Sequence, residues 1–414
     1  MSSGKTSPRI LYLSLYPPHK STFGGELRSH HVLRALQQMG RVEVVVVDSE
    51  GAESESDAEP TGDLGYAYSV EVKRRPEKGW VEKLRWALDP RILYPHGSGV
   101  DEEATRRVLN SVGEFDLLWF CKLRTANMFR CWNWPRSVVD IDDVPSTYER
   151  AALQSGGSLR EQLLTFNRIL SWRRREKLLG ERFNVLAVCS ETDRHYLARV
   201  GVNVPVHVIP NGFEQPFAEP VRRPTIPPRI GFTGVFDHTP NVEGVRWFLK
   251  ECWPRIKREV PDVRLRVAGR YSDGPLKPLG PDVEALGWVE DIDAEMATWS
   301  VMVVPILLGA GTRIKIALGF SRKCPIVSTS PGAYGYDIRD GEEMFLADGP
   351  EAFAGACVRQ IQRPKEAVKM AERAYRKFLE NWTWEAIQPR IWTAAEDCLR
   401  RSGGGLPRPG TPSS

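Results

Sequence analysis

Two cations follow a glycine-rich turn in the second half of the chain, and this combination is suited to holding a diphosphate. The turn Gly309-Ala-Gly-Thr-Arg-Ile-Lys315 comes directly after Val301–Leu308, an apolar run typical of a strand buried on both faces in a parallel sheet. Glycines let the backbone approach a bulky anion, and a helix start offers unpaired N–H groups with a favourable dipole. A guanidinium binds two phosphate oxygens at once, and an ammonium adds a point charge. The sequence therefore predicts a phosphate-binding turn made of Gly309, Gly311, Thr312, Arg313 and Lys315. A tight strand–helix turn with two solvated cations is the alternative.

Carboxylates follow an apolar strand in the first half of the chain. Asp140-Ile-Asp-Asp143 comes after Ser137-Val-Val139. Three carboxylates at a strand end are costly unless they contact solvent, cations or a polar ligand. They have the chemistry to bind a divalent metal, to accept hydrogen bonds from sugar hydroxyls, or to cap a helix beginning near Pro145. We expect Asp142 to point into a cleft if the strand ends at Ile141, and a capping role for Asp143 is the alternative.

Other predicted strands also end in glycine, hydroxyl or cationic residues. Asn241 is predicted to cap the helix that follows Gly234, and His238 to reach a ligand. The backbone at Trp288 and Val289 is suited to reading a nucleobase edge, whereas Gly24-Gly25 either admits a substrate to the backbone or simply closes its loop. Ligands bind beyond the carboxyl ends of parallel strands. We therefore add these residues to the predicted binding sites: Gly24, Gly25, Gly234, His238, Gly269, Arg270, Trp288 and Val289.

Strand-like and helical runs alternate through both halves, which predicts α/β architecture with parallel sheets. The predicted strands are 10–15, 42–47, 117–121, 137–141 and 184–189, then 230–233, 264–268, 283–286, 301–305, 326–328 and 344–346. The predicted helices are 26–39, 102–112 and 160–183, then 242–259, 292–299, 314–320, 350–362 and 365–401, the last interrupted near residue 383. The acidic stretch Ser49–Gly62 is predicted to be a surface loop.

Five prolines in Phe213–Pro228 indicate a linker between two doubly wound domains. The predicted domains are 1–212 and 229–385, with a final helix over 386–401 and a disordered tail over 402–414.

Composition narrows the class of protein. The chain has 57 basic and 53 acidic residues in 414, a net charge of +4, which argues against a dedicated nucleic-acid binder. Seven scattered cysteines form no CxxC or Cys/His spacing, so neither a disulfide framework nor a zinc site is indicated. No apolar run approaches the roughly 18–20 residues that span a bilayer. We expect a soluble cytoplasmic protein.

These motifs resemble those of the retaining GT-B glycosyltransferases of the large family four, also called group 1. The resemblance covers roughly residues 9–398. It implies two Rossmann-like domains facing across a cleft, a nucleoside diphosphate-sugar donor held mainly by the second, a final helix crossing back to the first, and no obligatory metal or other cofactor. It also places Asp142 near the transferred sugar, with Asp142, Arg313 and Lys315 as the catalytic residues. Its most specific motifs are the turn at 309–315, Cys324-Pro-Ile-Val-Ser-Thr329 with Gly332, Val188-Cys-Ser190 with Asp193, and Val208-Ile-Pro-Asn-Gly212.

Two family features are absent from this sequence. The usual Glu-x7-Glu pair reads Ala310 and Leu318, and the Arg and Lys often found after the first glycine turn of the second domain are missing from Val235–Pro240. Ribose contacts must differ, or donor binding is weakened. A nucleotide-sugar epimerase and a non-catalytic nucleotide-sugar-binding relative are therefore the alternatives to sugar transfer onto an acceptor hydroxyl.

The acceptor is not fixed by the sequence, and lipid-linked, glycan and small-molecule acceptors remain open. Cations alternate with indoles in two segments, 73–86 and 168–177. Such segments are suited to peripheral contact with an anionic membrane. A solvated basic face with tryptophans in the core is the alternative interpretation.

Overall fold

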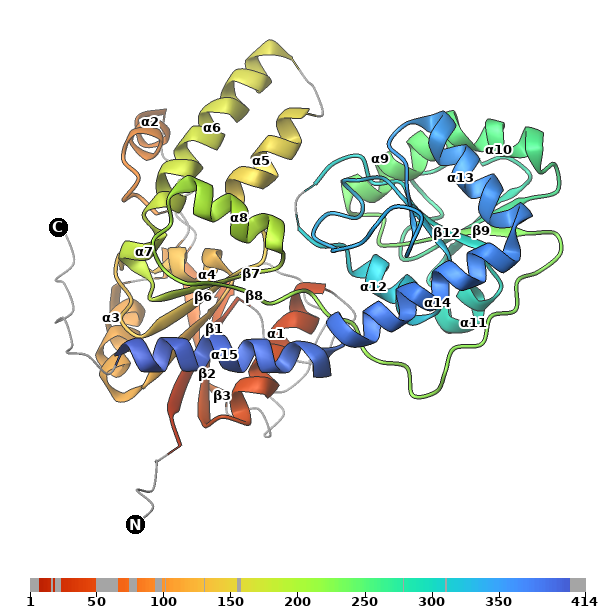
Figure 1. Cartoon of the computed structure of the whole chain (residues 1–414). Coiled ribbons are helices and arrows are strands. Elements are labelled where there is room, and N and C mark those ends of the chain that lie inside the picture. The colour runs from red at the N-terminus through yellow and green to blue at the C-terminus, as the bar shows by residue number, and fades with distance from the viewer. Residues whose placement is uncertain are drawn as a thin grey trace. The chain divides into compact units, whose positions relative to one another are not determined.

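The structure is a computed structural model that describes residues 7–15, 18, 24–49, 66–73, 80–93, 99–100, 102–129, 131–154, 158–277, 279–309 and 311–402. The chain divides into two units (Figure 1). The first comprises Met1–Leu153, Gly157–Ile209 and Gln388–Ser414, and the second comprises Gln154–Gly156 and Pro210–Ile387. Each unit has a sheet and a hydrophobic core of its own.

The first unit is built on an eight-stranded sheet in the order β4-β3-β2-β1-β5-β6-β7-β8. Its neighbouring strands are parallel, apart from the antiparallel pair β3 and β4. Three central strands are buried along their whole length, as a parallel sheet covered on both faces requires. The strands are β1 (Arg9–Ser14), β2 (Arg41–Ser49), β3 (Tyr66–Lys73), β4 (Gly99–Val100), β5 (Leu117–Cys121), β6 (Ser137–Ile141), β7 (Val185–Val188) and β8 (Val206–Val208).

The helices of the first unit include a pair, α5 and α6, that runs side by side (Figure 1). The last helix, α15 (Trp384–Ser402), lies beside α1, where Trp392 Nε1 donates to the Ala35 carbonyl at 2.9 Å. The remaining bounds are α1 (Gly24–Gln37), α2 (Trp80–Leu88), α3 (Glu102–Ser111), η1 (Val112–Glu114), α4 (Leu123–Met128), α5 (Pro145–Gln154), α6 (Leu159–Lys177), α7 (Leu179–Arg182) and α8 (Glu191–Val200).

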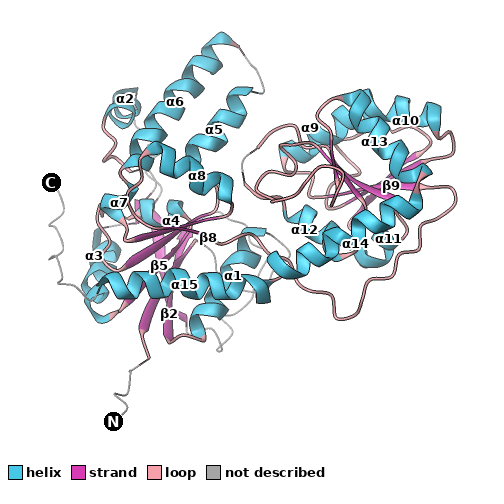
Figure 2. Cartoon of the chain, viewed as in Figure 1, coloured by secondary structure: helices cyan, strands magenta, loops and turns pink. Residues whose placement is uncertain are grey.

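The second unit has a six-stranded parallel sheet in the order β11-β10-β9-β12-β13-β14, enclosed by helices (Figure 2). Its strands are β9 (Arg229–Thr233), β10 (Arg264–Ala268), β11 (Val283–Gly287), β12 (Val301–Val304), β13 (Ile326–Ser328) and β14 (Phe345–Leu346). Its helices are α9 (Thr239–Trp247), η2 (Phe248–Cys252), α10 (Trp253–Glu259), α11 (Ile292–Ala297), α12 (Ile314–Ser321), α13 (Pro350–Gln362) and α14 (Pro364–Asn381).

The predicted α/β class with parallel sheets is confirmed, and most elements lie within two residues of their predicted bounds. Two long predicted helices are wrong in detail. The helix predicted over 242–259 contains a π-helical turn at Phe248–Cys252, followed by a new first turn that includes Pro254. The helix predicted over 160–183 ends at Lys177 and continues as the short α7. Periodicity alone does not register such local breaks, because the apolar spacing continues across them.

Some predictions fall partly outside the described residues. The acidic stretch 49–62 and the tail 402–414 lie almost entirely outside them, and so does Ala310. The proline-rich segment 213–228 has no helix or strand, and Arg223 N–H donates to the Ala297 carbonyl at 2.8 Å in the second unit. Among the described residues, no helix is both long and apolar enough to cross a membrane.

Candidate functional site at the strand ends

Both sheets reverse their strand order at one point, which is where α/β sheets bind ligands. In the first unit, β1 separates β2 from β5, and in the second, β9 separates β10 from β12. The loops after two such neighbouring strands turn to opposite faces and leave a crevice at the carboxyl edge. The predicted turn 309–315 follows β12 and Gly234 follows β9, so both lie at the reversal point of the second unit. Gly25 follows β1 and begins α1, at the reversal point of the first unit.

Lys315 turns from the first turn of α12 towards the loop after β9. Its ammonium donates to Asn241 Oδ1 at 2.8 Å and lies 4.1 Å from the centre of the Phe232 ring. A Cβ at Gly234 would come within 2.8 Å of this ammonium, so the glycine provides the space that Lys315 fills. Burial, with a smaller contribution from nearby Arg313, lowers the pKa of Lys315 well below its usual value. The lysine is held by a neutral amide and an aromatic face, and an incoming anion would stabilise its charge.

Asn241 has a different role from the predicted helix cap. The N-cap of α9 is His238, whose side chain makes no capping hydrogen bond, and Asn241 lies inside the first turn. Its amide nitrogen donates to the Val235 carbonyl at 2.7 Å while its oxygen accepts from Lys315. The side chain therefore fixes the loop after β9 and the lysine together.

Arg313 lies at the N-cap of α12 and folds back over its own turn. Its Nη2 contacts the Leu308 carbonyl at 3.4 Å, and any Cβ at Gly309 would overlap this nitrogen. Gly309 and Gly311 have φ values of 130° and 82°, a region that favours glycine. Tyr336 Oη donates to the Arg313 carbonyl at 2.9 Å. The positive φ values thus favour glycine at both positions of the predicted turn. At Gly309 the Arg313 guanidinium also leaves no room for a Cβ.

Thr312 and His238 complete the positive edge. Thr312 Oγ1 accepts from Asn211 Nδ2 at 2.8 Å, which ties the turn to the segment after β8. Burial lowers the pKa of His238, and the charges of Arg313 and Lys315 lower it further. The structure therefore brings His238, Arg313 and Lys315 within electrostatic range of one another. Arg313 and Lys315 supply the positive charge of this edge, and positive charge raises the local concentration of anions.

The neighbouring strand ends approach each other through glycines. Gly269 has a φ of 132°, and a Cβ there would lie 1.9 Å from the Gly234 carbonyl oxygen. Gly269 N–H donates to the Gly287 carbonyl at 2.8 Å, while the Arg270 carbonyl accepts from Phe236 N–H at 3.0 Å. The predicted residues Gly234, Gly269 and Arg270 therefore form one continuous edge. Only a backbone without Cβ atoms can approach so closely.

The predicted base-reading residues lie at the next strand end along. Gly287 ends β11 with a φ of 64°, and the Trp288 ring that follows is 63% exposed. Val289 is partly buried and packs on the hydrophobic core beneath. An exposed indole offers a flat surface on which a nucleobase can stack. The sequence predicted that the backbone alone recognises the base here, and the Trp288 side chain adds a second type of contact.

In the first unit, the carboxylates at the end of β6 and just after it have separate roles. Asp140 is buried, and Arg28 of α1 donates to it through Nε at 2.9 Å and Nη2 at 2.6 Å. This bidentate pair joins α1 to β6. Asp142 lies nearer the surface, where Lys122 Nζ is 3.6 Å from Oδ2 and the Cys189 thiol donates to Oδ1 at 3.3 Å. Burial raises the pKa of Cys189 well above its usual value, so this thiol keeps its proton.

Lys122 was missed by the sequence reasoning. It follows β5 with a φ of 73°, and its ammonium would lie 2.8 Å from a Cβ at Gly25. Gly24 begins the same helix. The absence of a side chain at Gly25 thus leaves room for Lys122, which in turn pairs with Asp142. Nothing in the sequence indicates that a lysine will adopt a positive φ. The Gly24-Gly25 pair, in contrast, can be read directly from the sequence.

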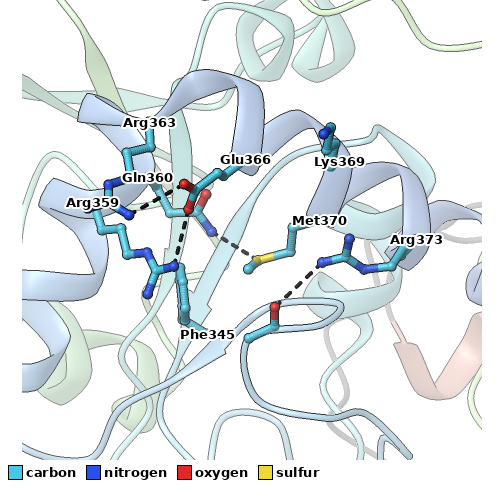
Figure 3. Close-up of a pocket in the computed structure, with 9 residues that line it drawn as sticks. Phe345, Arg359, Gln360, Arg363, Glu366, Lys369, Met370 and Arg373 are labelled. Atoms are coloured by element: carbon cyan, nitrogen blue, oxygen red, sulfur yellow. Dashed lines mark hydrogen bonds and ion pairs between the residues drawn. The ribbon is translucent and has the colours of Figure 1, made fainter.

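A cavity of about 170 Å³ lies between α13, α14 and the segment before β14 (Figure 3). Its three arginines are already engaged, since Arg359 and Arg363 contact Glu366 at 3.1 and 3.4 Å and Arg373 donates to the Glu342 carbonyl at 2.7 Å. None of the predicted site residues lines it. Its lining consists of Gly341, Phe345, Arg359, Gln360, Arg363, Glu366, Lys369, Met370 and Arg373.

Two parallel-stranded units with polar residues at the strand-order reversals define the class of protein: the chain has the GT-B fold of two Rossmann-like domains. Residues 227–363, about a third of the chain, match the family model described as "Glycosyl transferases group 1". The match covers the whole cationic edge described above.

Solved structures share this fold, and one curated relative matches part of the chain. Sucrose-phosphate synthase from Thermosynechococcus elongatus superposes with a TM-score of 0.66 at 15% identity, over 95% of this chain and 100% of the other. HepE from Anabaena, solved in complex with UDP-glucose, gives a TM-score of 0.59 at 14% identity, over 94% and 99% of the chains. An uncharacterized 44.6 kDa protein in the cps region of Klebsiella pneumoniae is 22% identical over 258 residues, which span 59% of this chain and 64% of that protein.

Two positions that usually carry carboxylates in the family carry Ala310 and Leu318 here, and the structure describes the second of them. Leu318 lies on α12, partly buried against the hydrophobic core. Among the described residues, no group of three or more His, Cys, Asp or Glu side chains is arranged to hold a metal ion.

Proposed function

We propose that this chain transfers a sugar from a nucleoside diphosphate-sugar to an acceptor hydroxyl with retention of configuration and without a metal ion. The observation that carries the proposal is the position of Lys315, which is partly buried beside Asn241 and Gly234 at the reversal point of a sheet in the part of the chain that matches the glycosyltransferase group 1 model. A diphosphate placed there would meet Lys315, Arg313 and the free N–H groups at the start of α12.

The same lysine compensates for a family feature that the sequence lacks. The loop Val235–Pro240 has no Lys or Arg, but the Lys315 ammonium reaches the mouth of this loop from α12. The positive charge is therefore present at this location although it comes from another element. This supports donor binding in spite of the altered motif.

In the proposed reaction, the bond between the anomeric carbon and the β-phosphate oxygen breaks as the acceptor oxygen bonds to that carbon from the same face. Negative charge grows on the diphosphate, and Lys315 and Arg313 stabilise it more as the bond lengthens. The acceptor proton passes to the departing β-phosphate oxygen. Asp142 is paired with Lys122 and Cys189, so we assign it to sugar hydroxyls rather than to proton abstraction.

The donor to test first contains uridine, because HepE is described in complex with UDP-glucose and with UDP and glucose. We place the reaction in the cytoplasm, since a charged nucleotide-sugar does not cross a bilayer unaided. The base and sugar can be assigned by a thermal-shift screen of nucleotide-sugars, in which a bound donor raises the melting temperature by mass action.

Donor turnover should be measured for Lys315→Ala and Arg313→Ala. Losing one charge-assisted contact costs about 1.5–3 kcal/mol, which is roughly a 10–150-fold loss in kcat/KM. Lys369→Ala on α14 is the matched control, since it removes an exposed lysine from the same unit and should leave turnover unchanged. Unchanged kinetics in both site variants would reject this phosphate site.

Retention and metal independence need their own measurements. The anomeric configuration of the product, read by NMR before mutarotation, should match that of the donor. Turnover should persist in excess EDTA after the protein has been stripped of metal. An inverted product or a strict metal requirement would each overturn the corresponding part of the proposal.

A non-catalytic role is the second candidate, because Leu318 replaces one of the usual carboxylates. Calorimetric binding of UDP with no product after long incubation with acceptor candidates would favour it. NMR of the donor incubated alone tests the third reading, since an epimerase would convert the donor into its epimer without an acceptor.

A further inference from the structure

We propose that the outward side of α6, together with α2, is a surface that docks on an anionic lipid bilayer. The docking face is defined by four exposed apolar residues and by the cations next to them. The apolar residues of α6 are Leu159, Leu163 and Phe166, which are 75%, 58% and 50% exposed, and Leu88 of α2 is 65% exposed. The cations are Arg173, Arg174 and Lys177, all exposed near the end of α6.

Three of the four large apolar residues of α6 that are at least half exposed lie on one side of the helix, and the fourth, Leu164, lies away from that side. Leu159, Leu163 and Phe166 occupy positions i, i+4 and i+7, which share a face in a helix of 3.6 residues per turn. The opposite side is the one that packs on the protein, because Thr165, Ile169 and Arg175 are buried. A helix that turns leucine and phenylalanine outward leaves a face that an apolar partner would cover.

The cations continue the same face. Arg173, Arg174 and Lys177 stand at i+14, i+15 and i+18 from Leu159, so they lie on the side that carries the leucines. The first half of this face is therefore apolar and the second half is cationic. Interfacial helices combine these two properties, since the apolar side chains enter the acyl boundary while the cations contact phosphate headgroups.

The neighbouring helix α2 adds to this surface. Val81, Leu84 and Leu88 are 45%, 49% and 65% exposed and occupy positions i, i+3 and i+7. The helix is held against α6 by the Trp86 ring, which lies 4.1 Å from the Arg175 guanidinium and 5.5 Å from the Trp172 ring. The tryptophans thus anchor α2, and the aliphatic residues are what it presents outward.

The position of these helices relates the surface to the proposed reaction. Helix α5 begins four residues after β6, close to Asp142, and Ser146 in its first turn contacts Glu176 of α6 through N–H at 2.8 Å and Oγ at 2.6 Å. The α5–α6 pair therefore rises from the carboxyl edge of the first sheet (Figure 1). If the proposed function holds, a bilayer against α6 would bring a lipid-linked acceptor to the edge that carries Asp142.

Charge complementarity selects a bilayer over a second copy of this chain. Two docking faces brought together by a two-fold axis would place the three cations of one copy near those of the other if the helices were parallel. If the helices were antiparallel, the cations would lie against the apolar half of the other copy. An anionic bilayer contacts the apolar half of the face with its acyl chains and the cationic half with its phosphate headgroups. Each basic residue near such a surface strengthens binding about fivefold at ordinary ionic strength, and the effect weakens as salt rises.

The experiment is vesicle flotation of the full chain with phosphatidylcholine alone and with phosphatidylglycerol added. We expect binding to the phosphatidylglycerol vesicles, reduced by salt. Arg173→Gln with Arg174→Gln and Lys177→Gln should weaken this binding on the order of 100-fold. Leu159→Ser with Leu163→Ser and Phe166→Ser should weaken it at least tenfold and lower its residual level at high salt, because these residues supply the apolar contact.

Variants on α14 are controls, and the cationic one has the same number of changes as the cationic variant of α6. Lys365→Gln with Lys369→Gln and Arg376→Gln removes three exposed cations, and Val368→Ser removes an apolar side chain that is 54% exposed. Both should bind vesicles as the unchanged chain does. Equal melting temperatures and equal UDP binding among all variants would show that the fold and the donor site are intact, so this test and the test of sugar transfer fail independently.

Two results would overturn the proposal. One is absence of binding to phosphatidylglycerol vesicles, or binding that the α6 and α14 variants weaken equally. The other is a stable dimer by sedimentation that dissociates when Leu159, Leu163 and Phe166 are replaced, with no vesicle binding, since the face would then cover a second copy of the chain.

Discussion

The two sheets end in charged residues at equivalent points, but they balance those charges differently. In the first unit, Arg28 is paired with Asp140 and Lys122 with Asp142. In the second unit, Lys315 is held by the amide of Asn241 and the Phe232 ring. Among the residues that the structure describes, no carboxylate forms an ion pair with Lys315. The first edge is therefore neutralised by its own side chains, and the second gains most from an anion that arrives as a ligand.

This difference distinguishes the charges that stabilise the fold from those that we propose bind the donor. A bidentate buried pair satisfies both partners and gives little attraction for a ligand. A buried lysine held by neutral groups costs stability, and that cost is recovered when a phosphate binds. Substitutions at the first edge should therefore lower the free energy of unfolding. Substitutions at the second edge should instead lower the affinity for UDP.

The largest effect on stability is expected from Arg28→Met. It leaves the Asp140 carboxylate buried without its partner, which should lower the free energy of unfolding by about 3–5 kcal/mol. Chemical denaturation of the full chain measures this loss. Adding Asp140→Leu should recover much of it, because an apolar pair avoids the isolated charge. A single variant as stable as the parent would show that this pair does not join α1 to β6 in the way described.

Lys315→Met should have the opposite pattern. Removing a partly buried ammonium held by neutral groups should leave the free energy of unfolding unchanged or raise it, while UDP affinity falls by roughly 10–150-fold. Calorimetry and denaturation of the same preparation test both halves of this expectation. Loss of stability together with loss of binding would mean that the lysine is structural, as Arg28 is.

The pH dependence of stability sharpens the contrast. The folded-state pKa of Lys315 is lowered by burial and then by Arg313, so the unfolded chain binds the proton more strongly than the folded chain does. Its contribution to stability is thus present near the unfolded value of about 10.4 and is lost as pH falls through the lowered folded value. The stability difference between Lys315→Met and the parent should therefore shrink as pH rises. A constant difference would contradict the lowered pKa.

Proton uptake on binding is the matching ligand experiment. A phosphate beside Lys315 raises its pKa, so UDP binding should take up protons above about pH 7.5, where the phosphate itself is already ionised. Calorimetry in buffers of different ionisation enthalpy measures this uptake. Lys315→Met should abolish it, and Lys122→Met in the first unit should not.

The smallest effect is expected from Asn211→Ala. This change removes the hydrogen bond to Thr312 and leaves the cations in place. A neutral hydrogen bond contributes about 0.5–1.5 kcal/mol, so UDP affinity should fall by roughly 2–12-fold. A loss as large as that of Lys315→Met would mean that positioning of the turn, rather than its charge, dominates binding.

Much of the fold was predictable because its signals are local. Apolar runs such as 117–121 and 137–141 are buried strands because both of their faces are covered, and their bounds were predicted without error. The turn at 309–315 was also predictable, since glycines and cations after a strand have few other uses. In contrast, β3 and α2 were missed. Each lies beside a stretch rich in charged residues, and the charged pattern of that stretch was the only feature read from this part of the sequence.

The candidate site was predictable as residues but not as contacts. Arg28 and Asp140 are 112 positions apart, and Asn211 and Thr312 are 101 apart, so their pairing depends on how strands are ordered in the sheet. The prediction that Arg313 simply faces a ligand missed its fold back over Gly309. The membrane interpretation of 73–86 and 168–177 named cations and indoles, whereas the structure exposes leucines of α6 and α2 and uses Trp86 in the core.

The order of amino acids by itself determined that this chain forms two parallel-stranded domains with a cationic glycine turn at the end of one strand, because periodicity and turn chemistry act between near neighbours. Only the tertiary structure decided which charges meet. Strand order places Asp140 beside Arg28 and gives Lys315 an amide instead of a carboxylate, and the free energy of a buried charge depends on that partner far more than on the residues next to it in the chain.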